Sequence, residues 1–302
     1  ADWANAKTYA KKVIDSPYKL YTTKKGQWSA YQQLFMGDNG ENGASVEAIF
    51  PILQDGLKTT SYGTTLYLMA GSNDNSEHIK SATIAGNSTT GGWAGNRMRP
   101  DLVLKFFPNN DAPNVAAYAM PAAADDDRAL FDGEGRNVSN GDDEKGVKVF
   151  TNGFSVCKFN NFKTDGSAGH NSLFPDADFF LMRAAEAYLM YAEADARQNN
   201  GTTTAQGTAY INALRTRANA TTQTAYSLRQ ICDEWSREFY FEGLRRTTLI
   251  RFGYFGGNVN YNWSWKGGVK NGRNFDSHLN LFPIPTSDLV ANEANLIQNP
   301  GY

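Results

Sequence analysis

The pattern of apolar and polar positions changes character near residue 178. From there onward, apolar residues recur every three or four positions, as on the buried face of an amphipathic helix. The clearest series consists of Phe180, Ala184, Ala187, Tyr191 and Ala194. The pattern predicts three helices, over 176–198, 204–220 and 227–253. Helices joined by short turns, with alanines where they meet, resemble tetratricopeptide-type (TPR-like) pairs, although no period of about 34 residues repeats.

Before residue 178 the pattern is less regular. Residues 1–16 predict a helix, because Asp2 can cap a segment whose apolar residues follow helical spacing. Short apolar runs predict a strand or buried segment at 45–53, a short helix at 99–108 and an alternating strand at 153–161. Most of 56–178 is rich in Gly, Asn, Asp and Ser, and the acidic stretch 125–144 is expected to form a surface loop. This part of the chain is therefore expected to consist mainly of loops.

The end of the chain, residues 281–302, combines loop-forming residues with apolar ones. Pro283 and Pro285 favour an extended backbone, and Pro300-Gly301 favours a final turn. A short helix from Asp288 to about Asn292 is expected between them. The apolar residues are Leu281, Phe282, Ile284, Leu289, Leu296 and Ile297. We expect this segment to be ordered, with Phe282, Ile284 and Leu296 buried against the body of the protein.

Composition narrows the function classes. The net charge is −2 and only 20% of the residues are charged, so no nucleic-acid-binding surface is expected. Aromatic residues make up 13% of the chain, which is typical of exported proteins that handle carbohydrate. No run of 18 apolar residues is long enough to span a bilayer. One pair of cysteines, Cys157 and Cys232, does not make a disulfide framework, and Cys232 falls on the apolar face of the third helix.

Glutamates on the third helix are the first candidates for chemistry. Glu234, Glu238 and Glu242 recur every four residues, and two carboxylates on one face can act as a glycosidase pair. Arginines surround them, however, and ion pairing lowers a carboxylate pKa, the wrong direction for a general acid. These glutamates have two interpretations: a structural network of ion pairs, or a hydrolase site that uses Glu238 and Glu242. Gly243, inside the expected helix, predicts close packing of a neighbouring segment.

Metal and cofactor chemistry has little support in the sequence. His78, His170 and His278 are far apart and lack the spacing of metal ligands, so we expect surface or packing roles. The stretch 132–137 has some likeness to a calcium loop but misses its pattern, which leaves open one cation among residues 125–144. The chain contains no phosphate-binding loop, dinucleotide fingerprint or nucleophile elbow, and no cofactor is expected.

Two aromatic sets are candidates for ligand binding. Tyr62 and Trp93 lie in Gly-rich loops, where a ring can be exposed, and Asn96 and Arg97 follow closely as hydrogen-bonding groups. Trp93 can equally well anchor its own loop. The second set, Tyr261, Trp263 and Trp265, alternates along one side of an extended segment and can be a sugar platform or a scaffold.

Together the segments resemble the SusD/RagB family of outer-membrane nutrient-binding lipoproteins. The resemblance rests on FFLMRAAEAYLMYAEA (179–194), INALRTRA (211–218), DEWSREFYFEGLRRTTLIRFG (233–253) and the closing LFPIPTSDLVANEANLIQNPGY. Their order also matches, and the resemblance covers essentially the whole chain. Members of the family are longer, so we expect this chain to be a C-terminal fragment without the N-terminal helical region.

The resemblance implies a mainly α fold in which TPR-like helical pairs support a loop-rich ligand-binding lobe. Residues 1–177 are the expected lobe with its N-terminal helix. Residues 178–302 are the expected helical region with a packed C-terminal segment, and the two parts are expected to form one intertwined domain. In the family, stacking aromatics come from this middle part of the chain, which favours Tyr62 and Trp93, whereas the second aromatic set serves as scaffold.

The implied function is capture of an oligosaccharide at the surface of a Gram-negative outer membrane. The glycan is delivered to a SusC-like TonB-dependent transporter, and no bond is broken, so no enzyme is expected. A lipid anchor in the missing N-terminal part is the expected membrane attachment. The alternatives are a peptide ligand on the same fold, and a glycoside hydrolase that uses Glu238 and Glu242.

Overall fold

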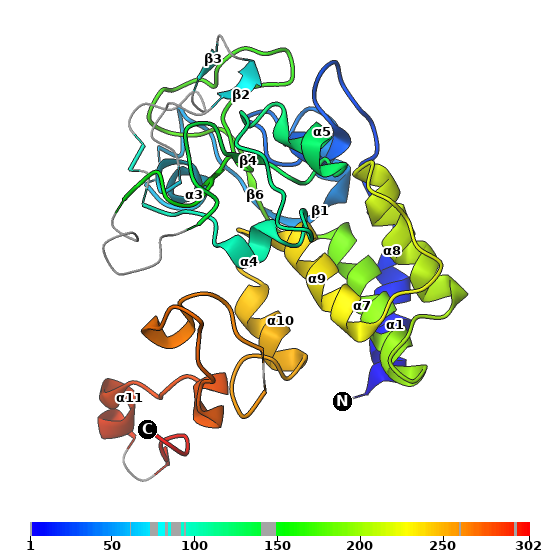
Figure 1. The fold of residues 1–302 in the computed structure, drawn as a ribbon, viewed down its shortest axis with the longest axis vertical. Coiled ribbons are helices and arrows are strands. Elements are labelled where there is room, and N and C mark those ends of the chain that lie inside the picture. The colour runs from blue at the N-terminus through cyan, green and yellow to red at the C-terminus, as the bar shows by residue number, and fades with distance from the viewer. Residues whose placement is uncertain are drawn as a thin grey trace. The chain divides into compact units, whose positions relative to one another are not determined.

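The computed structural model describes residues 2–60, 62–72, 78–81, 84–85, 92–93, 95–139, 149–259, 261–292 and 295–302. The chain groups into two compact units, Ala1–Glu242 and Gly243–Tyr302. It is mainly helical with a few short strands, which confirms the fold class expected from the sequence (Figure 1). The division into 1–177 and 178–302 proposed from the sequence stays a prediction.

Four helices form one side of the first unit. Helix α1 (Trp3–Ile14) lies along α7 (Ala184–Gln198), and α7 also contacts α8 (Ala205–Arg217) and α9 (Leu228–Phe239) (Figure 1). Alanines of α7 such as Ala184, Ala185 and Ala192 are fully buried, because small side chains let the helices approach closely. Asp2 caps α1 as expected, accepting a hydrogen bond of 3.0 Å from the backbone N–H of Asn5.

The helix expected over 176–198 is wrong in its first part. Strand β6 (Phe179–Arg183) pairs antiparallel with β1 (Ala48–Ile52), and α7 begins only at Ala184. Along β6, Phe180 and Arg183 are buried whereas Leu181 and Met182 are exposed. Periodicity could not separate the two structures, because a short apolar run fits either, and the partner strand that decides lies far away in the sequence.

The helix expected over 227–253 is interrupted. After α9 ends at Phe239, helix α10 (Arg245–Arg251) begins in the second unit. Phe241 and Gly243 have φ values of +63° and +81°, in the left-handed region that a right-handed helix excludes. The close packing expected at Gly243 is also wrong, since no atom lies within 4 Å of the position that a Cβ would occupy. Gly243 is needed for its backbone conformation.

Short elements build the loop-rich part of the first unit. They are α2 (Ala30–Gln33), the 3-10 helix η1 (Ala44–Glu47), α3 (Thr65–Ala70), α4 (Pro100–Val103) and α5 (Met120–Ala124). Two further antiparallel pairs join β2 (His78–Ser81) to β3 (Ile84–Ala85) and β4 (Phe131–Asp132) to β5 (Ser155–Val156). The strand expected at 153–161 is thus reduced to two paired residues. The helix expected at 99–108 is α4, which has Pro100 at its first position.

Two buried aromatic clusters fix these loops. The first contains Tyr31, Leu34, Phe35, Phe159 and Phe180. The second contains Phe106, Met120, Phe131, Phe154 and Val156. The partly buried Phe241 packs against both clusters. Segments with little regular structure therefore have cores of their own, which hold their exposed side chains in fixed places.

The second unit contains α10, the 3-10 helices η2 (Lys266–Gly268) and η3 (Ser277–Asn280), and α11 (Thr286–Ala291). Tyr261 stacks on Tyr254 at 4.8 Å between ring centroids, and Trp263 contacts Phe255 and Phe275. These contacts favour the scaffold role for Tyr261 and Trp263.

The C-terminal segment is held by its own hydrogen bonds. The Gln298 amide bonds both the N–H (2.8 Å) and the carbonyl (3.0 Å) of Ile284, and the Tyr302 hydroxyl donates to the carbonyl of Leu281 at 2.8 Å. Helix α11 confirms the expected short helix. Phe282 and Leu296 are exposed and Ile284 is half-buried in the structure. Packing of this segment against the rest of the chain stays a prediction.

Two expectations from composition concern cysteines and membranes. Both cysteines are free and buried. Cys232 lies on the buried face of α9, as expected. Within the described part of the chain, no helix combines the length and the apolar character needed to cross a bilayer.

Candidate functional site

Helix α3 presents an exposed tyrosine that the sequence reading missed. Leu66, Met69 and Ala70 of α3 are buried, and the Thr65 hydroxyl donates to the carbonyl of Ala177 at 2.8 Å. The opposite side of the short helix carries Tyr67, whose ring is 58% exposed. A six-residue helix shows too little periodicity to reveal this face, so the position of Tyr67 comes from the tertiary contacts of α3.

Trp93 pairs with Tyr67 at the surface. The ring centroids are 5.4 Å apart with the rings at 67°, and Trp93 is 55% exposed. The Trp93 backbone N–H donates to the carbonyl of Ala70 at 2.6 Å, at the end of α3. Trp93 is thus fixed by its backbone, while its ring stays accessible beside Tyr67. Anchoring of the loop and exposure of the ring, which the sequence set as alternatives, occur together.

Asn96 and Tyr62 also lie close to α3. The Asn96 N–H donates to the carbonyl of Gly71, and a Cβ at Gly71 would lie 2.6 Å from the carbonyl oxygen of Tyr67 and 2.7 Å from the Asn96 amide nitrogen, so the chain is tightly packed at this glycine. The exposed Tyr62 ring precedes α3 and meets the ring of Phe174 edge-on at 5.1 Å. Tyr62, Tyr67 and Trp93 therefore gather around one helix. Whether Tyr62 shares a depression with Trp93 stays a prediction.

Arg97 holds a neighbouring turn. Its Nη1 donates to the carbonyl of Val149 and to that of Asn152 (2.8 Å), and its guanidinium lies 5.7 Å from the centroid of the Phe150 ring. Burial, and then the nearby Arg136 charge, lower the pKa of Arg97. A hydroxyl-binding role for Arg97 stays a prediction, and the contacts show that the side chain also positions the 149–152 turn.

The glutamates of α9 face a buried network of charges. Glu238 is fully buried and accepts hydrogen bonds from Nη1 of Arg183 (2.7 Å) and Nη1 of Arg128 (3.3 Å). Arg183 also bonds both carboxylate oxygens of Glu242, at 2.8 and 2.9 Å. The buried Glu234 accepts from Nη1 of Arg128 at 2.6 Å. These carboxylates are paired with buried basic groups, and Glu234 and Glu238 have no access to solvent.

The pKa values of these glutamates do not suit glycoside hydrolysis. Burial alone raises the pKa of Glu238, but three neighbouring guanidinium groups lower it to about 2. Burial also raises the pKa of Glu234, but neighbouring guanidinium groups lower it well below its usual range. A glycosidase needs a carboxylic acid with a raised pKa as proton donor. The arrangement therefore fits the structural network and not a hydrolase pair of Glu238 and Glu242.

Lys158 is a member of this network that the sequence did not reveal. Its buried Nζ donates to Glu242 (2.6 Å) and to the carbonyl of Tyr240 (2.8 Å), and lies 4.4 Å from the centroid of the Phe35 ring. Burial lowers the pKa of Lys158 to about 8, although the Glu242 charge opposes this shift. The sequence offered one signal of this role: Lys158 is the single charged residue in the expected strand 153–161.

One group of side chains can hold a metal ion. Asp55, His170 and Asp176 each offer a ligand atom, and these atoms lie within 4.8 Å of one another. His170 Nδ1 is 2.9 Å from a carboxylate oxygen of Asp176, whose two oxygens also accept backbone N–H groups of Gly56 and His170. Sequence spacing could not show this group, because Asp55 comes from a loop far from the one that holds His170 and Asp176. The cation considered among residues 125–144 falls partly outside the described residues.

Comparisons with known proteins give a consistent result. A sequence profile described as the SusD family matches residues 46–302. The curated starch-binding protein SusD of Bacteroides thetaiotaomicron is 40% identical over a 333-residue alignment that covers 100% of this chain and 56% of that protein. The chain therefore spans little more than half the length of this relative.

Solved structures share the fold at lower sequence identity. A SusD-like protein from Bacteroides fragilis has a TM-score of 0.62 at 16% identity, over 99% of this chain and 62% of that one. The surface glycan-binding protein A of Bacteroides thetaiotaomicron, solved in complex with laminarihexaose, has a TM-score of 0.57 at 20% identity, over 98% of this chain and 59% of that one.

Proposed function

This chain belongs to the SusD family, and on that premise we propose that it captures an oligosaccharide at the surface of a Gram-negative outer membrane. The bound glycan passes to a SusC-like TonB-dependent transporter, and the protein breaks no bond. A lipid anchor attaches the protein to the membrane.

The exposed pair Tyr67 and Trp93 is the observation that carries the proposal. More than half of each ring is exposed, although large aromatic side chains normally bury most of their surface. A pyranose has an apolar C–H face and a rim of hydroxyls, so two rings at a fixed angle can accept neighbouring faces of a sugar chain. Asn96, exposed beside the pair, can bond the hydroxyl rim.

The relatives favour a glycan over a peptide. One relative is named as starch-binding, and one structural neighbour was solved with laminarihexaose. A peptide site would need charged groups to pair with the chain termini, whereas Tyr62, Tyr67 and Trp93 are uncharged and Arg97 already binds two carbonyls. Peptide binding is the alternative, and the binding experiment distinguishes it from glycan binding.

The test is titration calorimetry on the complete protein with maltoheptaose and with laminarihexaose. We expect Trp93→Ala and Tyr67→Ala each to weaken binding by about 5- to 150-fold, because one stacking ring is worth roughly 1–3 kcal/mol. Tyr9→Ala is the matched control, since Tyr9 is equally exposed but lies on α1. Circular dichroism checks that each variant is folded.

Three results would contradict the proposal. Unchanged affinity in both ring variants would move the platform elsewhere in the protein. Absence of binding to either glycan, together with binding of an unfractionated peptide mixture, would replace the glycan by a peptide ligand. Release of reducing ends from maltoheptaose would show that the protein is a hydrolase.

A further inference from the structure

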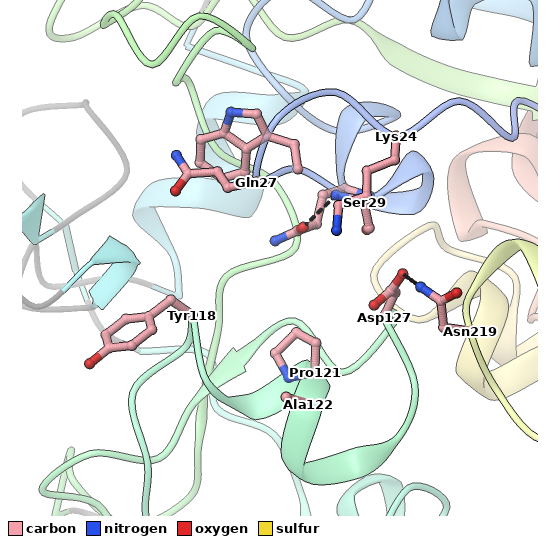
Figure 2. A pocket seen from close by; sticks show the side chains of 10 residues that line it. Lys24, Gln27, Ser29, Tyr118, Pro121, Ala122, Asp127 and Asn219 are labelled. Atoms are coloured by element: carbon pink, nitrogen blue, oxygen red, sulfur yellow. Dashed lines mark hydrogen bonds between the residues drawn. The ribbon is translucent and has the colours of Figure 1, made fainter.

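A pocket lies in the first unit, built by segments that are distant in the sequence. Figure 2 shows its lining side chains, which come from α2 and the loop before it, from α5 and the turns on either side of it, and from the turn after α8. The lining residues are Lys24, Gln27, Trp28, Ser29, Gln32, Tyr118, Pro121, Ala122, Asp127 and Asn219. Its volume is about 280 Å³, just below the usual range for ligand sites and suited to a single ring.

The walls of the pocket are fixed before any ligand binds. Ser29 and Gln32 form a reciprocal capping box at the start of α2. The buried Trp28 donates its indole N–H to the carbonyl of Thr164 at 3.1 Å. On the other side, the Asp127 backbone N–H donates to Ala218 at 2.8 Å. A preformed site loses little conformational entropy on binding.

Several polar side chains in the lining of the pocket can form further hydrogen bonds. Among the described residues, the side chains of Lys24, Gln27 and Tyr118 have no hydrogen-bond partner. Asp127 accepts one hydrogen bond, of 2.6 Å, from the Asn219 amide (Figure 2). Donors and acceptors are therefore mixed in the lining of the pocket, as the hydroxyl groups of a sugar require.

The charges in the pocket oppose each other. Lys24 is the cation and Asp127 the anion, so the lining as a whole is neutral. Burial raises the pKa of Asp127, and the Asn219 hydrogen bond and the Lys24 charge only partly offset this effect. Hydroxyl donors from a ligand would stabilise this carboxylate, whereas an acidic ligand would be repelled by it. The Tyr118 ring and Pro121 offer apolar surface to a C–H face.

We propose that this pocket binds one neutral hexose unit, as a second glycan site separate from the aromatic surface at Tyr67 and Trp93. The inference rests on the proposed glycan-binding function. The pocket takes a single unit of a sugar chain, while the open aromatic pair contacts consecutive units. Two sites on one protein raise the apparent affinity for a long glycan through effective concentration.

Saturation-transfer NMR on the complete protein tests the inference, with maltotriose and laminaritriose as probes. Trp93→Ala removes the first site and is expected to leave a weaker signal. Adding Tyr118→Ala or Gln27→Ala to that background is expected to lower the remaining affinity about five- to tenfold, the equivalent of one lost contact. Tyr9→Ala, added to the same background, is the control and is expected to leave the signal unchanged. Circular dichroism checks folding, which exposed residues such as Gln27 and Tyr118 are not expected to disturb.

The outcomes separate the two claims. A wild-type protein without signal for either sugar overturns the proposed function and this inference with it. Loss of the whole signal in Trp93→Ala leaves the proposed function standing and overturns the second site. If signal remains in Trp93→Ala and neither Tyr118→Ala nor Gln27→Ala reduces it, the second glycan site is also overturned. Glucuronic acid is the charge probe, and competition by it as strong as by glucose would contradict the neutral preference.

Discussion

Arg183 joins three carboxylates from two distant regions of the first unit. Its guanidinium bonds Glu47 (2.8 Å), Glu238 (2.7 Å) and Glu242, and lies 4.0 Å from the centroid of the Phe239 ring. A planar, permanently charged group with five donors can bond several carboxylates and can also pair with one carboxylate through two nitrogens, which the single nitrogen of a lysine cannot. At the scale of single residues, these buried pairs decide how the loops and helices meet.

Glu242→Ala tests the network at one position. The variant leaves Arg183 and Lys158 buried without one of their partners, so we expect the free energy of unfolding to fall by about 3–5 kcal/mol. Urea denaturation monitored by circular dichroism measures the change. Glu41→Ala is the control, because Glu41 is exposed and a surface replacement changes stability by about 0.5 kcal/mol or less. Equal stability of the two variants would show that Glu242 is not a structural residue.

At the scale of elements, the C-terminal segment shows how polar side chains replace regular structure. Gln298 bonds Ile284 on both its N–H and its carbonyl, as a neighbouring strand would, and the Asn299 amide donates to the carbonyl of Phe282. Arg246 of α10 donates to the carbonyl of Leu279 at 2.7 Å. The segment between Leu279 and Tyr302 is thereby ordered without a long helix or strand of its own.

Deletion of residues 295–302 removes the Gln298, Asn299 and Tyr302 bonds and is expected to lower the melting temperature. Gln298→Ala alone should lower the free energy of unfolding by about 1–2 kcal/mol, because both hydrogen bonds to Ile284 are lost. Differential scanning fluorimetry gives both values. Ile297→Ser is the control, since this side chain is 90% exposed and makes none of these bonds. A melting temperature that the deletion does not change would refute the assigned role.

At the scale of the whole first unit, one charge network connects the helical side with the loop-rich part. Glu47 comes from η1, Arg183 from β6, Arg217 from α8 and Glu238 from α9, and all four are buried. Arg217 bonds Glu47 at 3.1 Å and also Glu238. Protonation of one carboxylate therefore weakens contacts between several elements at once.

The stability of the protein should fall in acid. The pKa of Glu238 is about 2 in the folded state and 4.5 in the reference state, so the unfolded state binds more protons between these values. This stability is fully present above about pH 4.5 and is lost as the pH falls toward 2. The loss from Glu238 is about 3 kcal/mol, with Glu234 contributing in the same direction. Urea midpoints measured from pH 6 to pH 2.5 test this, and a midpoint that does not change would contradict the buried pairing.

The sequence by itself determined the helical framework and the family. Helices α1, α7 and α8 follow from apolar spacing and capping residues, because such signals are local and survive without knowledge of distant contacts. The exposed Trp93 was also expected from its glycine-rich surroundings. Local propensity was sufficient wherever one short window of sequence contains all the interactions that decide the structure.

The tertiary structure alone decided the strand β6, the break at Gly243 and the exposed pair. Strand β6 exists because β1 pairs with it, and Tyr67 becomes a ligand-facing candidate only because Trp93 docks on the end of α3. The small pocket likewise combines Gln27, Tyr118 and Asn219 from three regions of the chain. For the strand, the exposed pair and the pocket, the deciding partner is far away in the sequence, and no periodicity within one segment records a contact of that kind.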